Sequence, residues 1–501
     1  MKTKQIHDYK AEPSLLSIVK KPRIMIREIL AGLVTAFALI PEAISFAVIA
    51  GVDPKMGLYG SFILAISLAI IGGRPAMITG AAGATALVIA PLMKNYGLDY
   101  FVASIILAGV FQLILAGMGV AKLMRFIPRA VMVGFVNGLA ILIFSAQLPE
   151  LIHVPTAVYP LVALGIIIII FWPKLTKAVP APLIAIIVLT GITMFWNVQV
   201  PTVKDRGELP TSLPEIFLPQ VPLTFETFKI IAPYALGMAL VGLMETLLTA
   251  KLVDDMTDTH SNKTRESLGQ GFANVLSAFF GGMGGCAMIG QTMINVKISG
   301  GRTRLSSFAC GASLLILVLS LGEIVGQIPM AALVAVMIMV CVGTFDWHSI
   351  HPNTLKKLPF TYNVVMVSTV VSVVVTNNLA VGVILGVVIA SLIFVHNVAH
   401  LFEVEREIID DGGDDVANYH VHGQLFFASS NDLTTFFSYS KDPARVRIDM
   451  SDTNIWDTST VGALDAITTK YKKLGKTVEF VGMQEASHNI HSRITGSTGM
   501  E

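Results

Sequence analysis

The sequence predicts an α-helical protein that crosses a membrane many times, with a smaller α/β domain at its C-terminal end. The 501-residue chain is 53% hydrophobic and only 14% charged, whereas a soluble domain carries about 25% charged residues. Its mean hydropathy is +0.70. Long apolar stretches with short polar breaks run from about Arg27 to His400, and the composition turns polar after Leu401. We therefore expect a transmembrane domain over 27–400 and a soluble domain over 401–501.

The residues that precede the transmembrane domain are polar and rich in lysine. Because 1–26 contains no apolar core of a signal peptide, we expect a cytoplasmic N-terminal segment there and not a cleaved leader.

Apolar segments of span length divide the transmembrane domain. A membrane helix needs about 20 apolar residues, and breaks at glycine, proline and charge clusters give about fourteen segments. They centre near residues 38, 65, 85, 108, 136, 163 and 188 in the first half, and near residues 241, 274, 292, 313, 337, 368 and 390 in the second. The polar stretch 197–229 separates two predicted repeats of seven segments, at about 27–196 and 230–400. Since seven is odd, the second repeat would be inverted relative to the first.

Basic residues indicate the orientation. With the N-terminus inside, the loops on the cytoplasmic side contain Lys122, Arg125, Arg129, Lys174, Lys177, Lys251, Lys263, Arg265, Lys297, Arg302, Arg304, Lys356 and Lys357. The short loops on the other side, such as LPELIHVP and GEIVGQIP, contain no lysine or arginine. Basic loops remain in the cytoplasm. The pattern therefore predicts a multi-pass protein of the plasma (inner) membrane with both termini in the cytoplasm.

The third and tenth segments are short and interrupted by glycine. They read GGRPAMITGAAGATALV (72–88) and GGMGGCAMIGQTMINV (281–296). Paired breaks at matching places in two halves predict a binding site at the repeat interface, because non-helical backbone inside a membrane is stable only where it is buried or lines a cavity. The alternative is that these glycines allow close helix packing.

Two half-helices that begin inside the membrane would present free N–H groups and positive dipole ends. Such ends bind anions without a charged side chain. The predicted substrate-binding residues are Ala81, Ala82, Gly83, Met288, Ile289, Gly290 and Gln291. Gln291 would bond the substrate through its amide, or cap the broken helix.

Two acids lie inside apolar segments. Glu42 follows Pro41, which breaks the local hydrogen-bond ladder. An ionisable group at this depth is costly and is a functional candidate, so we expect Glu42 to carry the coupling proton; the alternative is a permanently protonated hydrogen-bond donor. Glu245 precedes Thr249 by one helical turn. The pair would coordinate Na⁺, relay a proton, or only stabilise helix packing.

Other functional classes find no support in the sequence. A net charge of +1 gives no indication of nucleic-acid binding. The three cysteines lie in apolar segments without metal-ligand spacing. We found no nucleophile–base pair and no nucleotide loop, so we expect no enzyme activity, no cofactor and no bound metal.

The C-terminal domain alternates strand and helix patterns. The stretches 417–428, 444–451 and 476–483 alternate like strands, and 460–475 is an amphipathic helix. This alternation predicts an α/β layer.

The chain resembles the SulP (sulfate permease) family of anion transporters. The resemblance covers nearly the whole chain and rests on PEAISFAVIAGVDPKMGLYGS (41–61), ETLLTAKLVDDMTDT (245–259), RESLGQGFANVLSAFFGG (265–282) and GGRTRLS (300–306). It implies seven plus seven inverted segments, a core domain that moves against a gate domain like an elevator, a homodimer and a cytoplasmic STAS domain. It also implies a substrate between the third and tenth segments.

The resemblance carries over to single residues. Glu42 falls where some prokaryotic members have a glutamate associated with proton coupling. Glu245 and Thr249 fall where a sodium-coupled bicarbonate member has aspartate and threonine. Gln291 stands where many relatives have arginine. In DMSDTNIWDTSTVGALDAI, which resembles the STAS signature, Thr458 corresponds to a serine that is phosphorylated in stand-alone STAS proteins; the alternative is a simple helix N-cap.

We therefore expect H⁺-coupled symport of a small anion: sulfate, bicarbonate or a dicarboxylate such as fumarate. A Na⁺-coupled bicarbonate transporter and an anion exchanger are the alternatives within the family. A nucleobase permease of the same fold is disfavoured by the STAS domain. In a different class, the protein would be a membrane-anchored signalling or scaffold protein that binds a cytoplasmic partner through STAS. Membrane lipid is an expected partner in every case.

Overall fold

The computed structural model describes residues 21–123, 127–176, 179–399, 401–411 and 415–495. The chain forms two compact units, Met1–Val387 and Val388–Glu501, and each has its own hydrophobic core. Most of the predicted N-terminal segment, together with Arg125 and Lys177, lies outside the described residues.

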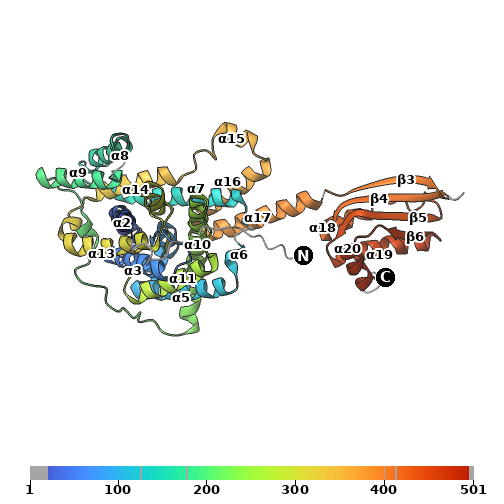
Figure 1. Cartoon of the computed structure of the whole chain (residues 1–501), viewed down its shortest axis with the longest axis horizontal. Coiled ribbons are helices and arrows are strands. Elements are labelled where there is room, and N and C mark those ends of the chain that lie inside the picture. Colours follow the sequence, from blue (N-terminus) through green and yellow to red (C-terminus); the bar gives the residue numbers. More distant parts are fainter. Residues whose placement is uncertain (1–20, 124–126, 177–178, 400, 412–414, 496–501) are drawn as a thin grey trace. The chain divides into compact units, whose positions relative to one another are not determined.

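The first unit is helical (Figure 1). Its α-helices are α2 (Pro22–Ala50), α3 (Pro54–Ile71), α4 (Gly83–Tyr96), α5 (Leu98–Gly117), α6 (Val120–Leu123), α7 (Arg129–Gln147), α8 (Val158–Leu175), α9 (Ala181–Phe195), α10 (Phe225–Thr257), α11 (Lys263–Phe279), α12 (Ile289–Met293), α13 (Arg304–Gly326), α14 (Met330–Thr344), α15 (Pro352–Lys357) and α16 (Phe360–Thr376). The helix α17 (Leu379–Ala399) begins in this unit and ends in the second. Shorter turns are η2 (Leu148–Leu151) and η3 (Val203–Arg206), and η4 (Ile294–Ile298) is a π-helix. All fourteen predicted segment centres fall within these helices, which confirms their positions.

Among the described residues, eight helices are long and apolar enough to cross a membrane. They are α2, α3, α5, α7 with η2, α8, α10, α13 and α17, and the shorter apolar helices are α9, α14 and α16. Proline at the first or second position starts α2, α3 and α9, where its missing N–H costs nothing. The total of fourteen membrane segments stays a prediction.

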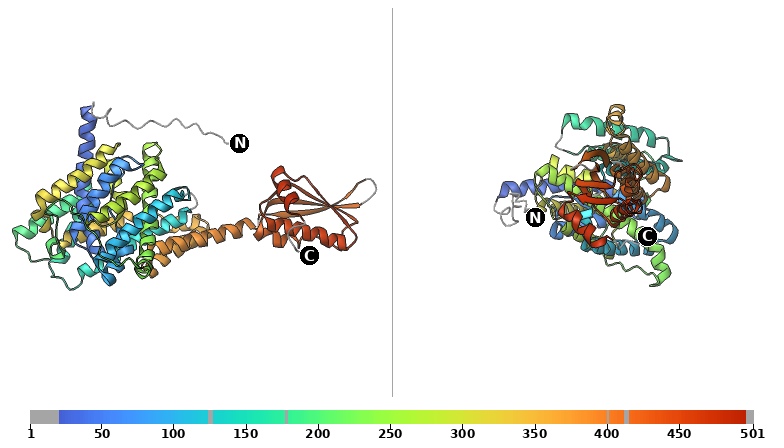
Figure 2. Two further views of the ribbon diagram at one scale, coloured as in Figure 1. Left: turned by 90° about the horizontal axis from the view of Figure 1, so that it is seen from below. Right: turned by 90° about the vertical axis from the view of Figure 1, so that its right-hand side faces the viewer.

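Two groups of helices pack within this unit, which Figure 2 shows as one bundle. One group contains α2, α3, α4, α5, α10, α11 and α13, and the other contains α7, α8, α9, α14 and α16. The contacts repeat when the halves are exchanged: α2 packs on α13 as α10 packs on α5, and α7 packs on α16 as α14 packs on α8. Two inverted repeats would produce this exchange, although the repeats themselves stay a prediction.

Two short strands lie in the middle of the bundle. The strands β1 (Thr79–Ala81) and β2 (Gly285–Ala287) pair antiparallel, with Gly80 opposite Cys286. Both strands are buried along their whole length. The pairing satisfies backbone groups that could not remain unbonded in an apolar interior.

The second unit is a four-stranded mixed sheet in the order β3-β4-β5-β6. Its elements are β3 (Glu403–Asp410), β4 (Asp415–Leu425), α18 (Phe427–Leu433), β5 (Arg445–Ile455), α19 (Thr458–Lys473), β6 (Thr477–Val481) and α20 (Glu485–Ile494). The first pair is antiparallel and the other two are parallel. Helices α19 and α20 cover one face (Figure 1). The three predicted strands and the predicted helix are confirmed, except that the end of the first strand is wrong, because 427–428 begin α18.

Thr458 does not cap α19, so its interpretation as an N-cap is wrong. The cap is Asp457, whose Oδ1 accepts the Thr460 N–H at 3.1 Å. An aspartate at this position satisfies a helix N–H better than a helical residue, whose side chain points away from the free donors. Thr458 is the first helical residue and is exposed. Its predicted phosphorylation stays a prediction.

Candidate functional site

The site begins where each short strand turns into a helix. Ala82, with extended backbone, precedes the 14-residue helix α4. Met288, also extended, precedes α12, which is α-helical for only five residues and then continues as the five-residue π-helix η4. The first bonds within these helices run from Ala86 to Ala82 and from Thr292 to Met288. The N–H groups that precede these bonds have no partner in the helix.

The two helix starts lie at opposite ends of the β1–β2 pair. Met288 is opposite Ile78, whose carbonyl accepts the Met288 N–H at 2.9 Å. Ala82 lies four residue steps further along the same strand, which is about 13 Å. The structure therefore brings the two predicted triplets, 81–83 and 288–290, to the two ends of one short ladder, with both positive helix ends directed inward.

The two starts differ in the space around them. A Cβ at Gly290 would have nothing within 4 Å, whereas a Cβ at Gly83 would lie 2.7 Å from a Phe46 ring carbon and 3.0 Å from Ile143 Cδ1. The start of α12 is therefore open and the start of α4 is covered by side chains.

Close packing explains other glycines of the tenth segment. A Cβ at Gly285 would lie 1.9 Å from the Gly80 carbonyl oxygen, and one at Gly282 would lie 2.7 Å from Gly60 Cα. The packing alternative therefore applies to Gly282 and Gly285, and Gly290 is the residue whose surroundings leave room for a ligand.

Gln291 projects an unsatisfied amide at this open start. The residue is 1% exposed, and its Nε2 has no hydrogen-bond partner. The side chain faces the Glu42 carboxyl group, but not with the geometry of a formed hydrogen bond. A buried donor without a partner costs about 1–3 kcal/mol, so an acceptor that reached Gln291 Nε2 would stabilise this part of the fold.

Glu42 lies in the C-terminal half of α2 and is 8% exposed. The helix continues through Pro41, and the Ser45 hydroxyl donates to the Pro41 carbonyl at 2.8 Å. Glu42 and Gln291, which the sequence separates by about 250 residues, are therefore neighbours in the fold.

Glu245 contacts the same broken segment from α10. The Cys286 thiol donates to Glu245 Oε2 at 2.9 Å. The Thr249 hydroxyl donates at 2.8 Å to the backbone carbonyl of Glu245 and not to its carboxylate. The predicted pair thus lies on one helix, but the side-chain partner of Glu245 is Cys286.

Amide side chains of α11 and α5 hold β2 in place. Asn274 accepts the Gly285 N–H at 2.9 Å, and Gln270 Nε2 donates to the Gly285 carbonyl at 2.8 Å. Asn274 Nδ2 also donates to Gln112 Oε1 at 2.8 Å. All three amide residues are completely buried. The sequence analysis gives these three residues no role, although amide side chains within an apolar segment are a signal that could have identified them.

Hydroxyl and amide groups hold β1 in a similar way. The Thr292 hydroxyl accepts the Ile78 N–H at 3.0 Å, and Ser61 accepts the Ala81 N–H at 3.0 Å. Asn295 Nδ2 donates to the Ala76 carbonyl at 2.8 Å. Thr292 and Asn295 come from the tenth segment, so side chains of the tenth segment support the backbone of the third.

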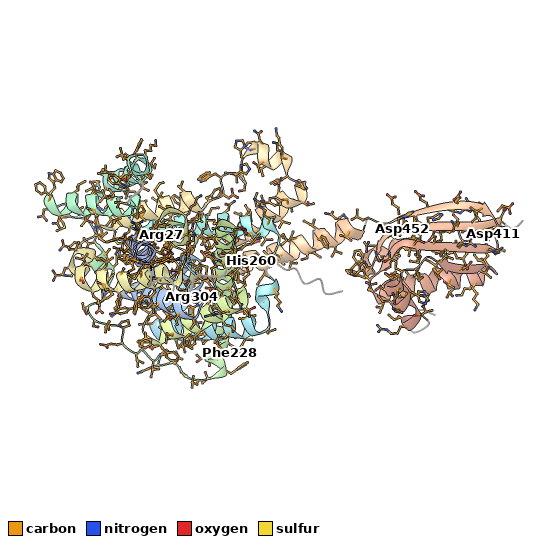
Figure 3. All side chains as sticks on the ribbon, in the orientation of Figure 1. Arg27, Phe228, His260, Arg304, Asp411 and Asp452 are labelled. Carbon is orange, nitrogen blue, oxygen red and sulfur yellow. The ribbon has the colours of Figure 1, made fainter. Side chains whose placement is uncertain are left out.

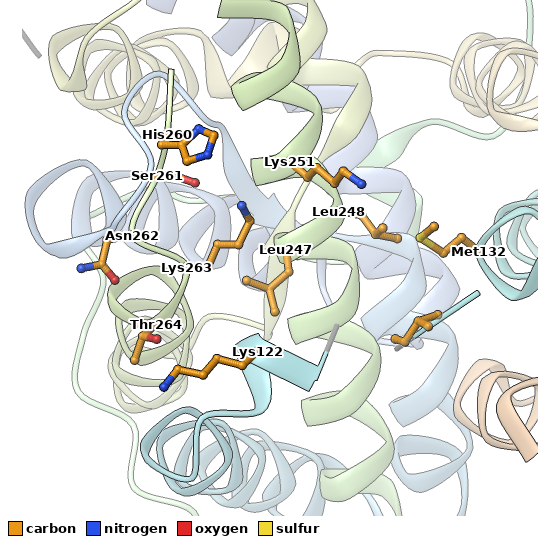
Figure 4. A pocket seen from close by; sticks show the side chains of 11 residues that line it. Lys122, Met132, Leu247, Leu248, Lys251, His260, Ser261, Asn262, Lys263 and Thr264 are labelled. Carbon is orange, nitrogen blue, oxygen red and sulfur yellow. The ribbon is translucent and has the colours of Figure 1, made fainter. Parts of the chain in front are cut away.

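A cavity of about 860 Å³ with a basic lining lies on the side that the sequence predicts to be cytoplasmic (Figure 4). Lys122, Lys251, Lys263 and His260 contribute to its wall. Lys263 is paired with Asp254 at 3.0 Å, whereas no carboxylate lies within 4.0 Å of Lys122 or Lys251 among the described residues.

The basic cavity is close to the broken segments. Leu247 and Leu248 form part of its wall, and Lys251 follows Glu245 by six residues on α10, which is about 9 Å along the helix. An anion in this cavity would lie close to the positive charges of Lys122 and Lys251.

The described residues contain no group of three or more histidine, cysteine or acidic side chains placed to hold a metal ion. The three cysteines are free and buried.

Comparison with known sequences decides the family. The sulfate permease family pattern matches residues 25–158 and 150–369, and the STAS domain pattern matches residues 388–496. The chain belongs to the sulfate permease family. The SulP resemblance and the C-terminal STAS domain are thereby confirmed, and this family member is an anion transporter and a multi-pass membrane protein, not an enzyme.

Named relatives and solved structures agree with this assignment. "Putative sulfate transporter YbaR" of Bacillus subtilis (strain 168) is 51% identical over 465 residues, which cover 93% of this chain and 96% of the relative. The bicarbonate transporter BicA of Picosynechococcus sp. is 28% identical over 425 residues, 78% of this chain and 73% of BicA.

Among solved structures, the transmembrane domain of a cyanobacterial BicA aligns with a TM-score of 0.65 at 24% identity, over 72% of this chain and 97% of that one. The murine Slc26a9 anion transporter aligns with a TM-score of 0.78 at 16% identity, over 98% of this chain and 92% of that one. These two similarities show the fold.

Proposed function

We propose that the protein is a secondary active transporter that carries a small anion together with H⁺, with the anion bound between the starts of α4 and α12. Sulfate, bicarbonate and small dicarboxylates are the proposed substrate class. The first two are the anions named for relatives of this chain, and all three are acceptors that free N–H groups at helix starts can bind.

The observation that carries the proposal is the relationship between Glu42 and Gln291. A buried amide donor without a partner stands at an open helix start and faces a buried carboxyl group. An anion would complete the hydrogen bonding of Gln291, and a proton on Glu42 would remove a negative charge that repels the anion at this distance. Binding of the two would thus favour each other, as symport requires.

Proton coupling is preferred to sodium coupling because of the bonds that Glu245 and Thr249 make. A sodium site would need the Glu245 carboxylate and the Thr249 hydroxyl oxygen to point at one cation. The thiol of Cys286 bonds that carboxylate, and the hydroxyl is directed to the helix backbone. Both residues are proposed to support the site and not to form a cation cage.

The two groups of helices support an elevator mechanism. The broken segments belong with the group of α2, α3, α5, α10, α11 and α13, which would move against the group of α7, α8, α9, α14 and α16. The basic cavity would be the cytoplasmic access path, where lysines raise the local anion concentration. Location in the plasma membrane, cytoplasmic termini, assembly as a homodimer and a cytoplasmic partner of STAS belong to the same proposal.

The test is reconstitution of the full chain in liposomes, followed by uptake of labelled sulfate, bicarbonate and fumarate with and without an imposed pH gradient. We expect uptake of at least one anion, faster with the inside alkaline and unchanged by a Na⁺ gradient. Uptake that depends on the Na⁺ gradient alone would show that the coupling ion is Na⁺ and not H⁺. Transport that needs an anion on both sides of the membrane would show exchange and contradict symport. Absence of flux for all anions would favour the scaffold function.

A further inference from the structure

A second cavity, of about 790 Å³, opens beside the first helix of the transmembrane unit. Its wall comes from α2, from the connection between α8 and α9, and from η4. The lining is mostly apolar and includes Ile26, Leu30, Val34, Pro180, Ile294 and Ile298. This groove shares no lining residue with the basic cavity described above.

One face of α2 forms a long wall of the groove. Arg23, Ile26, Arg27, Leu30 and Val34 are three, four, seven and eleven residues apart when counted from Arg23, which places them on one side of a helix. Ile26 and Leu30 are 54% and 52% exposed. The face is therefore basic at its start and apolar beyond it, and it remains about half exposed at Ile26 and Leu30.

The two arginines are available to an external anion. Figure 3 labels Arg27 on α2, and its side chain is 52% exposed. Arg27 lies 3.6 Å from Glu28, but the Glu28 carboxylate already accepts the N–H groups of Arg302 and Thr303 and the Thr303 hydroxyl. Glu28 therefore serves the start of α13, and the charge of Arg27 is only partly compensated.

We propose that this groove binds an anionic phospholipid, with the phosphate at Arg23 and Arg27 and one acyl chain along Ile26, Leu30 and Ile298. Helix α2 has 29 residues, about 43 Å, which exceeds the roughly 30 Å of bilayer hydrocarbon. Its first turns therefore lie at headgroup level, while the apolar part of the groove lies at the depth of the acyl chains. Basic pockets between membrane helices bind such headgroups.

The position of the groove gives the lipid a structural role. Two walls of the groove are connected to the candidate site, because Glu42 lies on α2 and because α12, which contains Gln291, leads into η4. The other wall comes from α8 and α9, which belong to the other group of helices. A lipid in the groove would lie between the two groups. An effect of the lipid on the transport rate would rest on the proposed elevator mechanism. Lipid binding itself does not rest on it, so the binding experiment remains decisive if the proposed function fails.

The experiment measures lipid retention by native mass spectrometry on the full chain, taken from nanodiscs of mixed phosphatidylglycerol and phosphatidylcholine. We expect wild-type protein to retain phosphatidylglycerol in preference. The double variant Arg23→Gln/Arg27→Gln should lose that preference, with binding weaker by roughly 10- to 30-fold. The matched control is Lys356→Gln/Lys357→Gln on α15, which removes two charges on the same predicted side and should retain the lipid.

A second variant tests the apolar part of the groove without changing charge. Ile298→Trp should fill it and displace the acyl chain, whereas Ile316→Trp should not. The two isoleucines are 61% and 63% exposed, and Ile316 does not line the groove. Retention that is independent of headgroup charge, or unchanged by both groove variants, would overturn the proposal. Cross-linking of the chain's own residues 1–20 into the groove would also overturn it, because that segment would then be the occupant.

Discussion

The thiol of Cys286 in β2 donates a hydrogen bond to Glu245 Oε2 in α10 over 2.9 Å. Both groups are buried. The bond fixes a carboxylate against the backbone of a broken segment, and it was not expected from the sequence, which had paired Glu245 with Thr249.

Two replacements of Cys286 distinguish the effect of its hydrogen bond on anion uptake from the effect of its side-chain volume. Cys286→Ala leaves a buried carboxylate without its donor, so we expect anion uptake in proteoliposomes to fall about tenfold or more. Cys286→Ser keeps a donor at the same place and should retain most of the uptake. Equal loss in both variants would show that sulfur volume matters and the bond does not.

Glu42→Gln should abolish the dependence of uptake on the pH gradient, because an amide exchanges no proton while it preserves the shape of the side chain. Flux driven by the anion gradient alone should persist. The measurement is uptake in proteoliposomes at equal and unequal internal pH. Glu215→Gln, in the exposed loop before α10, is the control and should retain coupling.

Gln291→Leu should raise the KM for the transported anion about five- to tenfold, because the substrate loses one hydrogen bond from a buried amide. The change removes an unsatisfied donor, so the melting temperature should stay the same or rise. A variant with unchanged KM would place the anion away from the start of α12.

Two glycines of one segment should respond in opposite ways to alanine. Gly285→Ala places a methyl group 1.9 Å from the Gly80 carbonyl oxygen, so the β1–β2 pair must separate and the protein should lose stability by several kcal/mol. Gly290→Ala meets open space and should be tolerated. Thermal unfolding in detergent, followed by tryptophan fluorescence, compares the two.

Asp449 in the STAS domain gives a prediction for pH. The Ser451 hydroxyl, 2.5 Å from Asp449 Oδ1, holds the pKa of this carboxyl below its usual value, and the Ser451 N–H and His420 act in the same direction. Because the folded pKa is lower than the unfolded one, about 3.9, the stabilisation is present above that value and is lost as pH falls through the folded pKa.

Ser451→Ala should therefore reduce stability near neutral pH by less than about 1 kcal/mol, since Asp449 is partly exposed. The difference from wild type should disappear in strong acid. Urea unfolding of the fragment 388–501, which has its own core, checks this at several pH values. A difference that persists in strong acid would show that the hydroxyl stabilises the fold by another route.

The positions of the long helices could be predicted because runs of about 20 apolar residues leave few alternatives in a membrane. The strands β1 and β2 could not, since three residues show no periodicity and each strand pairs with a partner about 200 residues away. The sequence analysis also does not predict strand β3. Its sequence EVEREIID belongs to an edge strand, and its many charged residues hide the alternation of apolar and polar residues that marks a strand.

The candidate site was predicted in part. Its glycines and acids stood out in the sequence, and the starts of α4 and α12 lie at the expected residues. The partners of those acids depend on side-chain direction. Cys286 alternates to one face of β2 and Gln291 turns toward α2, and neither direction follows from spacing alone.

The pairing of β1 with β2 has a consequence for biosynthesis. Roughly 200 residues separate the two strands, and a ribosome adds about 5–20 residues per second. For some 10–40 seconds, therefore, the backbone groups of the first strand that bond to β2 lack their partners. We expect the unfinished first half to be the form of this protein most prone to misfolding, and a factor that shields residues 79–81 during that interval should increase the yield of assembled protein.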